Sequence, residues 1–364
     1  MAGGFARTAY RFVNGAATLA VLGAASAHLP TRVFYGGARS GDGGGPLVKA
    51  RLLKQHFPDT RFGFSLVYLL SNALYLPDAV VSAIRARGIP IVLNQNGVFY
   101  SAWYPEGWER ENRRMAAAYH QANHVFWQSE FCRRCADKFL GARPGAGEVL
   151  YNAADTVRFR PNVEPRKSGP FVVLVTGKIA PDTAYRLLSS LDGVAEARRG
   201  GLDAVLRIAG TVAGSVETEM RAKAAALGIE DAVSFTGPYS SLDAPDIYRS
   251  ADAYLITKHN DPCPNVVIEA MASGLPVLYS ASGGVPELVG AEAGIGLPVE
   301  ESFERAVVPD GRAIAEGLSQ ITARREGMAV AARARAVERF GLENWIARHG
   351  AVFEQLVRDG SVTA

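Results

Sequence analysis

The sequence predicts an α/β protein with two parallel-sheet domains in tandem. Short apolar runs alternate with amphipathic stretches from Thr31 onward, which is typical of parallel strands connected by helices. A polar, proline-bordered segment over 162–169 interrupts the alternation, which restarts at Phe171. The 364 residues suffice for two domains of ordinary size. We therefore predict an N-terminal extension over 1–30, domains over 31–161 and 162–340, and a C-terminal helix over 341–364.

Each half has its own series of elements. In the first, a glycine-rich loop over 36–45 separates the first strand from a helix that Pro46 opens, a position that proline favours. The strands are predicted at 31–35, 64–70, 90–93, 125–128 and 148–151, and the helices at 46–57, 77–87, 109–122 and 129–140. In the second half, strands are predicted at 171–175, 204–209, 232–236, 253–257 and 276–280, and helices at 182–197, 216–227, 265–272 and 312–322, with a helical end over 327–358 that breaks near Gly341. Ligands of such sheets bind at the carboxyl ends of the strands.

Composition and charge narrow the function classes. Apolar residues make up 48% and charged residues 21%, a globular profile. Three cysteines cannot build a disulfide framework, and Cys132-x-x-Cys135 has no second pair, which disfavours a metal or redox site. Residues 1–160 hold 19 basic and 10 acidic residues. This excess favours an anionic lipid surface or a phosphorylated acceptor as partner, or else a solvated surface without a partner. No basic–aromatic array indicates nucleic acid.

Two strand ends in the second half carry the candidate chemistry. Asp261 follows the strand at 253–257, and Pro264 should be the first residue of the next helix. The free amides of Asn265 and Val266 would then offer a positive helix end to an anion or a sugar. Glu269 lies one turn further along the helix.

The next strand is followed by a turn of two glycines, whose main chain no side chain covers. The strand at 276–280 ends in a turn at Gly283 and Gly284, and a helix should begin near Pro286. Glycines at a helix start allow a ligand to approach the main chain closely.

The order of these residues resembles the donor-binding stretch of glycosyltransferase family 4, whose members are retaining enzymes of the GT-B fold. Here Asp261 is followed after seven residues by Glu269-Ala-Met-Ala-Ser-Gly-Leu-Pro-Val, and then by Gly283-Gly-Val-Pro-Glu287. Residues 150–161 resemble the passage between the two domains. The resemblance covers nearly all of 31–358, although outside these motifs it is limited to the general pattern of alternating strands and helices. It implies two Rossmann-like domains that face each other across a cleft, with a C-terminal helix that crosses back to the N-domain.

The resemblance also implies roles for single residues. Glu269 would hold the ribose hydroxyls of the nucleotide, Asp261 the donor sugar, and the backbone of Asn265 and Val266 the sugar and diphosphate. Lys178 stands where the family has an arginine that neutralises the diphosphate. The loop Gly43-Gly44-Gly45 would close over the phosphates and the acceptor, and Gly283 and Gly284 would line the donor site.

Two departures of this sequence from the family pattern matter. Asp261 replaces a glutamate, and Thr183 replaces a lysine, so that a diphosphate cation is missing. Lys258 or Arg186 are the candidates to supply it. Asn96, which precedes Gly97, is either an acceptor or sugar contact or simply a turn residue.

We therefore expect a retaining transfer of a sugar from a nucleoside diphosphate to an acceptor hydroxyl, in polysaccharide or glycolipid assembly. Neither a cofactor nor a metal is implied, and the partners are the nucleotide sugar and a saccharide or lipid-linked acceptor. A degenerate nucleotide-binding module without turnover is the alternative. A glycosidase that uses Asp261 and Glu269 would leave Lys178 and the glycine loop without a role, and the loop over 36–45 does not fit the G-x-G-x-x-G of dehydrogenases.

The first thirty residues allow two interpretations. Arg7 and Arg11 precede an apolar run over 16–27 that ends in Ala25-Ser26-Ala27, which resembles a secretion signal. The run is too short to span a bilayer. Because nucleotide sugars are cytoplasmic, we favour a helix that packs on the domain or lies on the inner face of the membrane.

Overall fold

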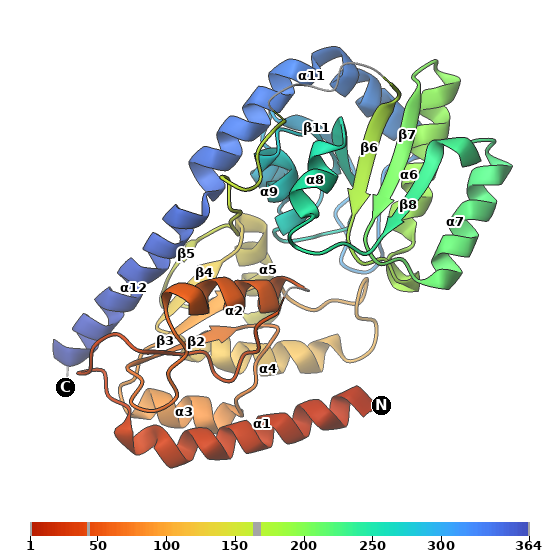
Figure 1. Ribbon diagram of the computed structural model, residues 1–364. Helices are drawn as coiled ribbons and strands as arrows, with labels where there is room; N and C mark the ends of the chain where they lie inside the picture. Colours follow the sequence, from red (N-terminus) through yellow and green to blue (C-terminus); the bar gives the residue numbers. More distant parts are fainter. Residues whose placement is uncertain (1, 42–43, 163–168, 363–364) are drawn as a thin grey trace. The chain divides into compact units, whose positions relative to one another are not determined.

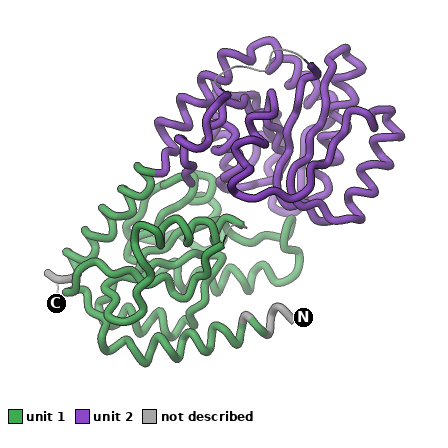
Figure 2. Tube along the Cα trace, viewed as in Figure 1, with its two compact units in different colours: residues 1–151, 343–364 green, residues 152–342 purple. Residues whose placement is uncertain are grey.

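The computed structural model describes residues 2–41, 44–162 and 169–362, and these divide into two compact units (Figures 1 and 2). Unit 1 comprises residues 1–151 and 343–364, and unit 2 comprises residues 152–342. The boundaries predicted at 161 and 340 thus differ from the unit boundaries at 151 and 342.

Unit 1 is built on a five-stranded, wholly parallel sheet with the order β1-β2-β3-β4-β5. Strands β2 and β3 are buried along their whole length, as expected when helices cover both faces of a parallel sheet. The strands are β1 (Val33–Phe34), β2 (Leu66–Leu70), β3 (Ile91–Gln95), β4 (His124–Trp127) and β5 (Ala146–Val149). The helices are α1 (Ala2–Val21), η1 (Leu22–Ala24), α2 (Gly45–His56), α3 (Asp78–Ala86), α4 (Trp108–Gln121), α5 (Glu130–Leu140) and α12 (Leu342–Val362).

Unit 2 is built on a six-stranded parallel sheet with the order β11-β10-β9-β6-β7-β8. The strands are β6 (Phe171–Thr176), β7 (Ala204–Ala209), β8 (Val233–Gly237), β9 (Ala253–Ile256), β10 (Val277–Ser280) and β11 (Gly294–Leu297). The helices are η2 (Pro181–Thr183), α6 (Tyr185–Arg199), α7 (Gly214–Ala226), η3 (Glu230–Ala232), α8 (Ala244–Arg249), α9 (Asn265–Ala272), α10 (Val285–Val289) and α11 (Gly311–Phe340). The predicted α/β class with two parallel sheets is confirmed.

The main errors of the prediction have local causes. Strand β11 was missed because two of its four residues are glycines. A Cβ on Gly294 would lie 2.0 Å from the carbonyl oxygen of Val277, so the strand pairs with β10 only without side chains there. The helices expected at 312–322 and from 327 onward are one helix, α11, with a kink at Arg324. The break near Gly341 separates α11 from α12.

Helix α12 is fixed to the sheet of unit 1 by buried aromatic residues. Phe353 is fully buried and meets the rings of Phe57 and Tyr68 edge to face. The carbonyl oxygen of Trp345 lies 2.8 Å from Nδ1 of His349, which must therefore donate, and Nε2 accepts from the hydroxyl of Tyr68 at 3.1 Å. Burial lowers the pKa of His349 to about 3.

This buried imidazole predicts a pH dependence of stability. The folded protein keeps His349 neutral down to about pH 3, whereas the unfolded chain binds a proton below about 6.5. The free energy of unfolding should therefore fall as the pH drops through this window, by at most about 1.4 kcal/mol per pH unit. Urea unfolding of wild type and H349Q across the window tests this. The histidine contribution is the difference between the two slopes, and parallel slopes would contradict it.

Candidate functional site

The loop after β9 carries an ion pair at the carboxyl edge of the unit 2 sheet. Nζ of Lys258 lies 2.7 Å from Oδ2 of Asp261, and Oδ1 of Asp261 accepts from the backbone amide of Cys263. The Asp261 side chain is largely buried, whereas that of Lys258 is 43% exposed. The Lys258 ammonium is thus paired with the Asp261 carboxylate, and the two groups together add no net charge to the site.

The same loop is held in an unusual backbone conformation. Asn260 has φ = 49°, and its Nδ2 donates to the carbonyl oxygen of Ser302. Nδ1 of His259 accepts from the amide of Val307, so Nε2 carries the proton and donates to the Ser302 carbonyl oxygen. The side chains of His259 and Asn260 therefore hold the loop against the segment 302–307 and fix the backbone that leads into Asp261.

A close contact joins this loop to the turn after β10. The amide of Gly284 donates to the carbonyl oxygen of Asp261 at 2.9 Å. Gly283 has φ = 68°, and a Cβ there would lie 2.4 Å from the same oxygen. Only glycine satisfies both conditions. The sequence predicted that Gly283 and Gly284 expose their main chain to a ligand. In the structure, the absence of side chains at these glycines makes room for the contact with the Asp261 loop.

Helix α9 begins directly behind the ion pair. It starts at Asn265, and Pro264 is its N-cap residue rather than its first residue as predicted. The amides of Asn265 and Val266 are the first two of the helix, which have no acceptor within it. Oδ1 of Asn265 is buried and, among the described residues, has no hydrogen-bond partner. Behind the helix start, Asn152 donates from Nδ2 to the carbonyl oxygen of Cys263.

Glu269 sits one turn into α9 beside a group of tyrosines. The hydroxyl of Tyr248, on α8, donates to Oε2 of Glu269 at 2.8 Å. Burial raises the pKa of Glu269, and the Tyr248 hydrogen bond and the charge of Arg158 act in the opposite direction. The Glu269 charge in turn adds to the effect of burial in raising the pKa of Tyr239, which follows β8. Tyr248 thus fixes one carboxylate oxygen.

The loop after β6 presents Lys178 to solvent. Gly177, with φ = 124°, turns the chain, and Lys178 is exposed. The Thr183 hydroxyl accepts from the Ala180 amide, so the residue that replaces a lysine closes the turn instead. These contacts leave Lys178 as the accessible cation of this loop.

A second cation lies beneath the same loop. Arg186, on α6, is 5% exposed and donates to the carbonyl oxygen of Thr176 at the end of β6. Its buried Nε has no hydrogen-bond partner among the described residues. The guanidinium therefore supports the β6 loop from below rather than facing solvent.

Unit 1 holds the remaining predicted residues. Gly44 caps α2 with φ = 87°, Gly45 is the first residue of that helix in place of Pro46, and Gly43 lies outside the described residues. Asn96 follows β3. Its backbone amide donates to Ser71 Oγ, and its side-chain Nδ2 donates to Asn72 Oδ1. The structure thus gives Asn96 a network of partners beyond turn chemistry.

This network continues into a buried lysine that sequence reasoning missed. Nζ of Lys49, on α2, lies 2.7 Å from Oδ1 of Asn94 and 2.9 Å from Oδ1 of Asn96, and its side chain is 4% exposed. Gln128, after β4, donates to both of these oxygens. Because an ammonium only donates, it fixes both asparagine oxygens toward itself. Within α2, Lys49 looks like any surface lysine in sequence, so only the fold reveals it.

Within unit 2, the structure brings most of the predicted residues to one edge. Strands β6, β9 and β10 are neighbours, so the loops after them meet at their carboxyl ends. These loops and α9 carry the predicted residues Lys178, Lys258, Asp261, Asn265, Val266, Glu269, Gly283 and Gly284. Arg186, the other predicted candidate for the missing charge, lies beneath the β6 loop, and Tyr248 is an addition. The amides, hydroxyls and cations at this edge suit a ligand with hydroxyls and phosphates.

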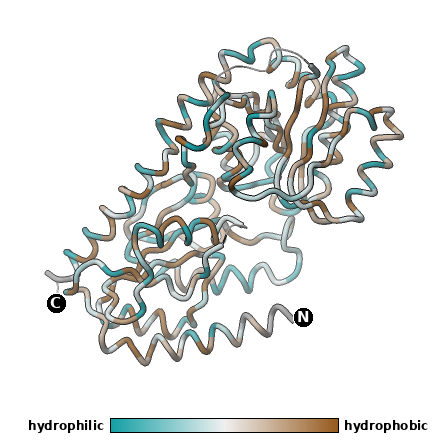
Figure 3. The backbone as a smooth tube through the Cα atoms, in the orientation of Figure 1, coloured by the Kyte–Doolittle hydropathy of each residue, from teal (hydrophilic) through white to brown (hydrophobic). Residues whose placement is uncertain are grey.

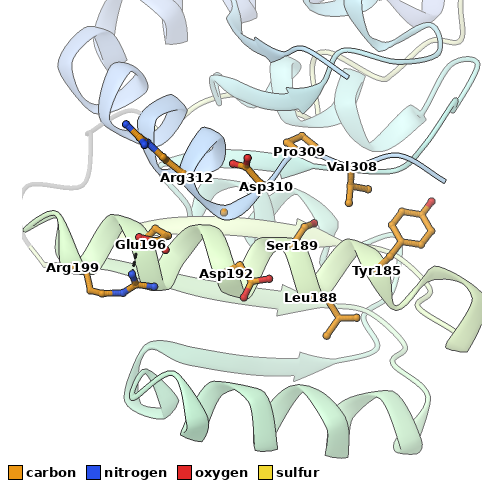
Figure 4. A pocket seen from close by; sticks show the side chains of 11 residues that line it. Tyr185, Leu188, Ser189, Asp192, Glu196, Arg199, Val308, Pro309, Asp310 and Arg312 are labelled. Carbon is orange, nitrogen blue, oxygen red and sulfur yellow. Dashed lines mark ion pairs between the residues drawn. The ribbon is translucent and has the colours of Figure 1, made fainter. Parts of the chain in front are cut away.

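A separate surface hollow of unit 2 contains none of the predicted residues. It lies between α6 and the segment that leads into α11 (Figure 4), and it is lined mainly by Tyr185, Asp192, Glu196, Asp310 and Arg312. Asp192 is paired with Lys223 at 2.7 Å, and Glu196 with Arg199 at 2.8 Å. Its lining holds the carboxylates of Asp192, Glu196 and Asp310 against the arginines Arg199 and Arg312, so it offers a phosphate no excess of positive charge.

Comparisons with known proteins show what unit 2 is similar to in sequence. Residues 158–324 match the family model described as glycosyl transferases group 1. The mannosylfructose-phosphate synthase of Agrobacterium fabrum is 34% identical over 118 residues, which are 31% of this chain and 26% of that protein. A D-inositol 3-phosphate glycosyltransferase of Saccharomonospora viridis is 28% identical over 209 residues, 54% of this chain and 46% of that protein. The chain thus spans less than half the length of these relatives.

Solved structures identify the fold. HepE of Anabaena, in complex with UDP, superposes with a TM-score of 0.65 at 18% identity, over 85% of this chain and 82% of that one. Sucrose-phosphate synthase of Thermosynechococcus elongatus gives 0.65 at 18% identity, over 82% and 75%. The GT-B fold and the resemblance to glycosyltransferases are confirmed, and these comparisons do not single out family 4.

The contact between Gly283 and Asp261 predicts an unusually costly glycine substitution. G283A should lower the free energy of unfolding by several kcal/mol, because it combines a left-handed backbone with a clash against main chain. Gly228 is the matched control: it has the same φ of 68° but open space around it. G228A should cost only about 1 kcal/mol. Equal losses in chemical unfolding would show that the loop contact does not constrain the fold.

Proposed function

We propose that this GT-B chain, whose residues 158–324 match group 1 glycosyl transferases, moves a sugar from a nucleoside diphosphate to an acceptor hydroxyl. The observation that carries the proposal is the edge of the unit 2 sheet, where the loops and helix start carry an ion pair, two helix amides, a half-buried carboxylate and an exposed lysine. Retained anomeric configuration, and a role in polysaccharide or glycolipid assembly, are part of the proposal and rest on the resemblance to family 4.

Glu269 holds the ribose hydroxyls of the donor in this proposal. Tyr248 occupies Oε2, which leaves Oε1 to accept from a ligand hydroxyl. Asp261, whose Oδ2 is fixed by Lys258 and Oδ1 by the Cys263 amide, stands beside the donor sugar. Asn265 adds a buried amide oxygen at the same helix start. These oxygens accept from sugar hydroxyls, and the helix amides face the phosphates.

Lys178 stabilises the leaving diphosphate. It is exposed in the β6 loop, where a flexible cation can follow the charge that develops as the sugar departs. Arg186, buried under the same loop, adds positive potential without direct contact and is our candidate for the charge missing at Thr183. Lys258 is the weaker candidate, because it is paired with Asp261.

The acceptor binds unit 1 at the carboxyl ends of β2, β3 and β4. There Asn94 and Asn96 accept from the ammonium of Lys49, and the amide groups of Asn72 and Gln128 bond to these two asparagines. Side-chain amides can form hydrogen bonds with the hydroxyls of a saccharide acceptor, and the ammonium favours an anionic substituent on that acceptor. The names of the two relatives contain a phosphorylated sugar or polyol. We therefore propose a phosphorylated or lipid-linked saccharide as acceptor, on the cytoplasmic side where nucleotide sugars occur.

One observation favours a second function, nucleotide binding without turnover. The Thr183 hydroxyl is used in the turn and supplies no charge to the diphosphate. Incubation with a panel of nucleotide sugars, with and without phosphorylated saccharide acceptors, separates the two. Release of nucleoside diphosphate that depends on acceptor supports transfer. Tight nucleotide binding with no release from any donor would establish the binding module instead.

Replacing Glu269 should abolish turnover. E269A removes the hydroxyl clamp and leaves the Tyr248 hydroxyl without its acceptor, so donor affinity should fall about ten- to hundredfold. E219A, which removes an exposed glutamate of helix α7, is the matched control and should behave as wild type. Titration calorimetry with the nucleoside diphosphate measures the effect. Wild-type affinity and turnover in E269A would refute the donor site.

Lys178 should affect chemistry far more than folding. K178A should lower kcat about a hundredfold or more, because one preorganised charge at a leaving group contributes about that much. Its unfolding midpoint should stay unchanged, since the side chain is exposed. K178R should retain most of the activity. A K178A enzyme that turns over normally would remove Lys178 from the mechanism.

A further inference from the structure

Helix α1 displays a continuous uncharged face to solvent. Its exposed residues include Ala9, Phe12, Val13, Ala16, Leu19 and Ala20, which lie within one arc of the helix. Phe12 is 75% exposed, Val13 65% and Leu19 49%. Figure 3 shows hydrophobic colouring along several turns of this helix. None of the exposed residues described in α1 carries a charge.

The opposite face of α1 is fixed to unit 1. Nδ2 of Asn14 donates to the carbonyl oxygens of Gly36 and Tyr75, each at 2.9 Å, and the Tyr10 hydroxyl donates to Gly37. Gly15 packs so tightly that a Cβ would lie 2.7 Å from the Pro77 ring. The helix is therefore an integral part of the unit, and its apolar face points outward because the polar contacts hold the other face inward.

Three exposed arginines contact α1 beside this face or at its C-terminal end. The Arg39 guanidinium lies over the Tyr10 ring at 4.7 Å, Arg61 donates to Oδ1 of Asn14, and Arg87 reaches the Gly23 carbonyl oxygen. All three side chains belong to exposed residues. Residues 1–90 contain ten lysines and arginines against three acidic residues. An apolar helix face on a segment with an excess of positive charge suits a helix that lies in the headgroup region of an anionic membrane.

We propose that the outer face of α1 docks unit 1 onto an anionic lipid bilayer. The helix lies in the interface and does not cross it, since no helix in the described part of the chain is long and apolar enough to span a membrane. A second copy of the chain fits this face less well, because a symmetric pair would bring the arginines of both copies together. The proposal goes beyond sugar transfer and would place the enzyme next to a lipid-linked acceptor.

Vesicle sedimentation of the full chain tests the proposal without any donor, so that its failure is distinguishable from failure of transfer. The vesicles contain either phosphatidylcholine alone or phosphatidylcholine and phosphatidylglycerol in equal parts. Wild type should bind only the second kind, and added salt should weaken the binding. V13E and F12E should each lower the partition coefficient about tenfold or more. V330E is the matched control: it places the same charge on an exposed helical valine of unit 2 and should bind as wild type.

Three outcomes would overturn the proposal. The first is that wild type does not bind anionic vesicles, and the second is that V13E and F12E bind as well as V330E. The third is that wild type binds no vesicles and forms a dimer that V13E dissociates, which would assign the face to a second copy. Circular dichroism and nucleoside diphosphate affinity of V13E should equal those of wild type, which shows that the loss of binding is not a loss of folding.

Discussion

The candidate donor site depends on one contact between main chains. The Gly284 amide binds the Asp261 carbonyl oxygen, and Gly283 leaves no room for a side chain between the two loops. This contact joins the ends of β9 and β10, so the position of Asp261 is set by a main-chain contact together with the buried side chains of His259 and Asn260. The ion pair with Lys258 and the start of α9 follow from that position, because both are only a few residues away.

The distribution of charge at this edge explains how a diphosphate could leave without a cofactor in the proposed reaction. Lys258 is balanced by Asp261, so the cation available to a ligand is Lys178, with Arg186 buried beneath it. A buried cation adds potential but cannot follow a moving phosphate, whereas an exposed lysine can. In the proposed reaction, a fixed charge, Arg186, and a mobile one, Lys178, together replace the cation missing at Thr183.

The sequence could predict what is local and periodic. It placed most strands, the start of α9 to within one residue, and the grouping of Asp261 and Glu269 at one sheet edge, because these follow from hydrophobic pattern and chain order. It could not predict contacts between distant segments. Tyr248 beside Glu269, Lys49 among the unit 1 amides, and the glycine strand β11 depend on tertiary packing, and none has a signal in its own neighbourhood.

Hydrogen exchange with and without a nucleoside diphosphate is the decisive measurement for the donor site, because it locates the ligand without assuming its sugar. We expect slower exchange of amides at the start of α9, including Asn265 and Val266, and around Gly283 and Gly284. Protection confined to the hollow between α6 and α11, around Asp192 and Asp310, would contradict it.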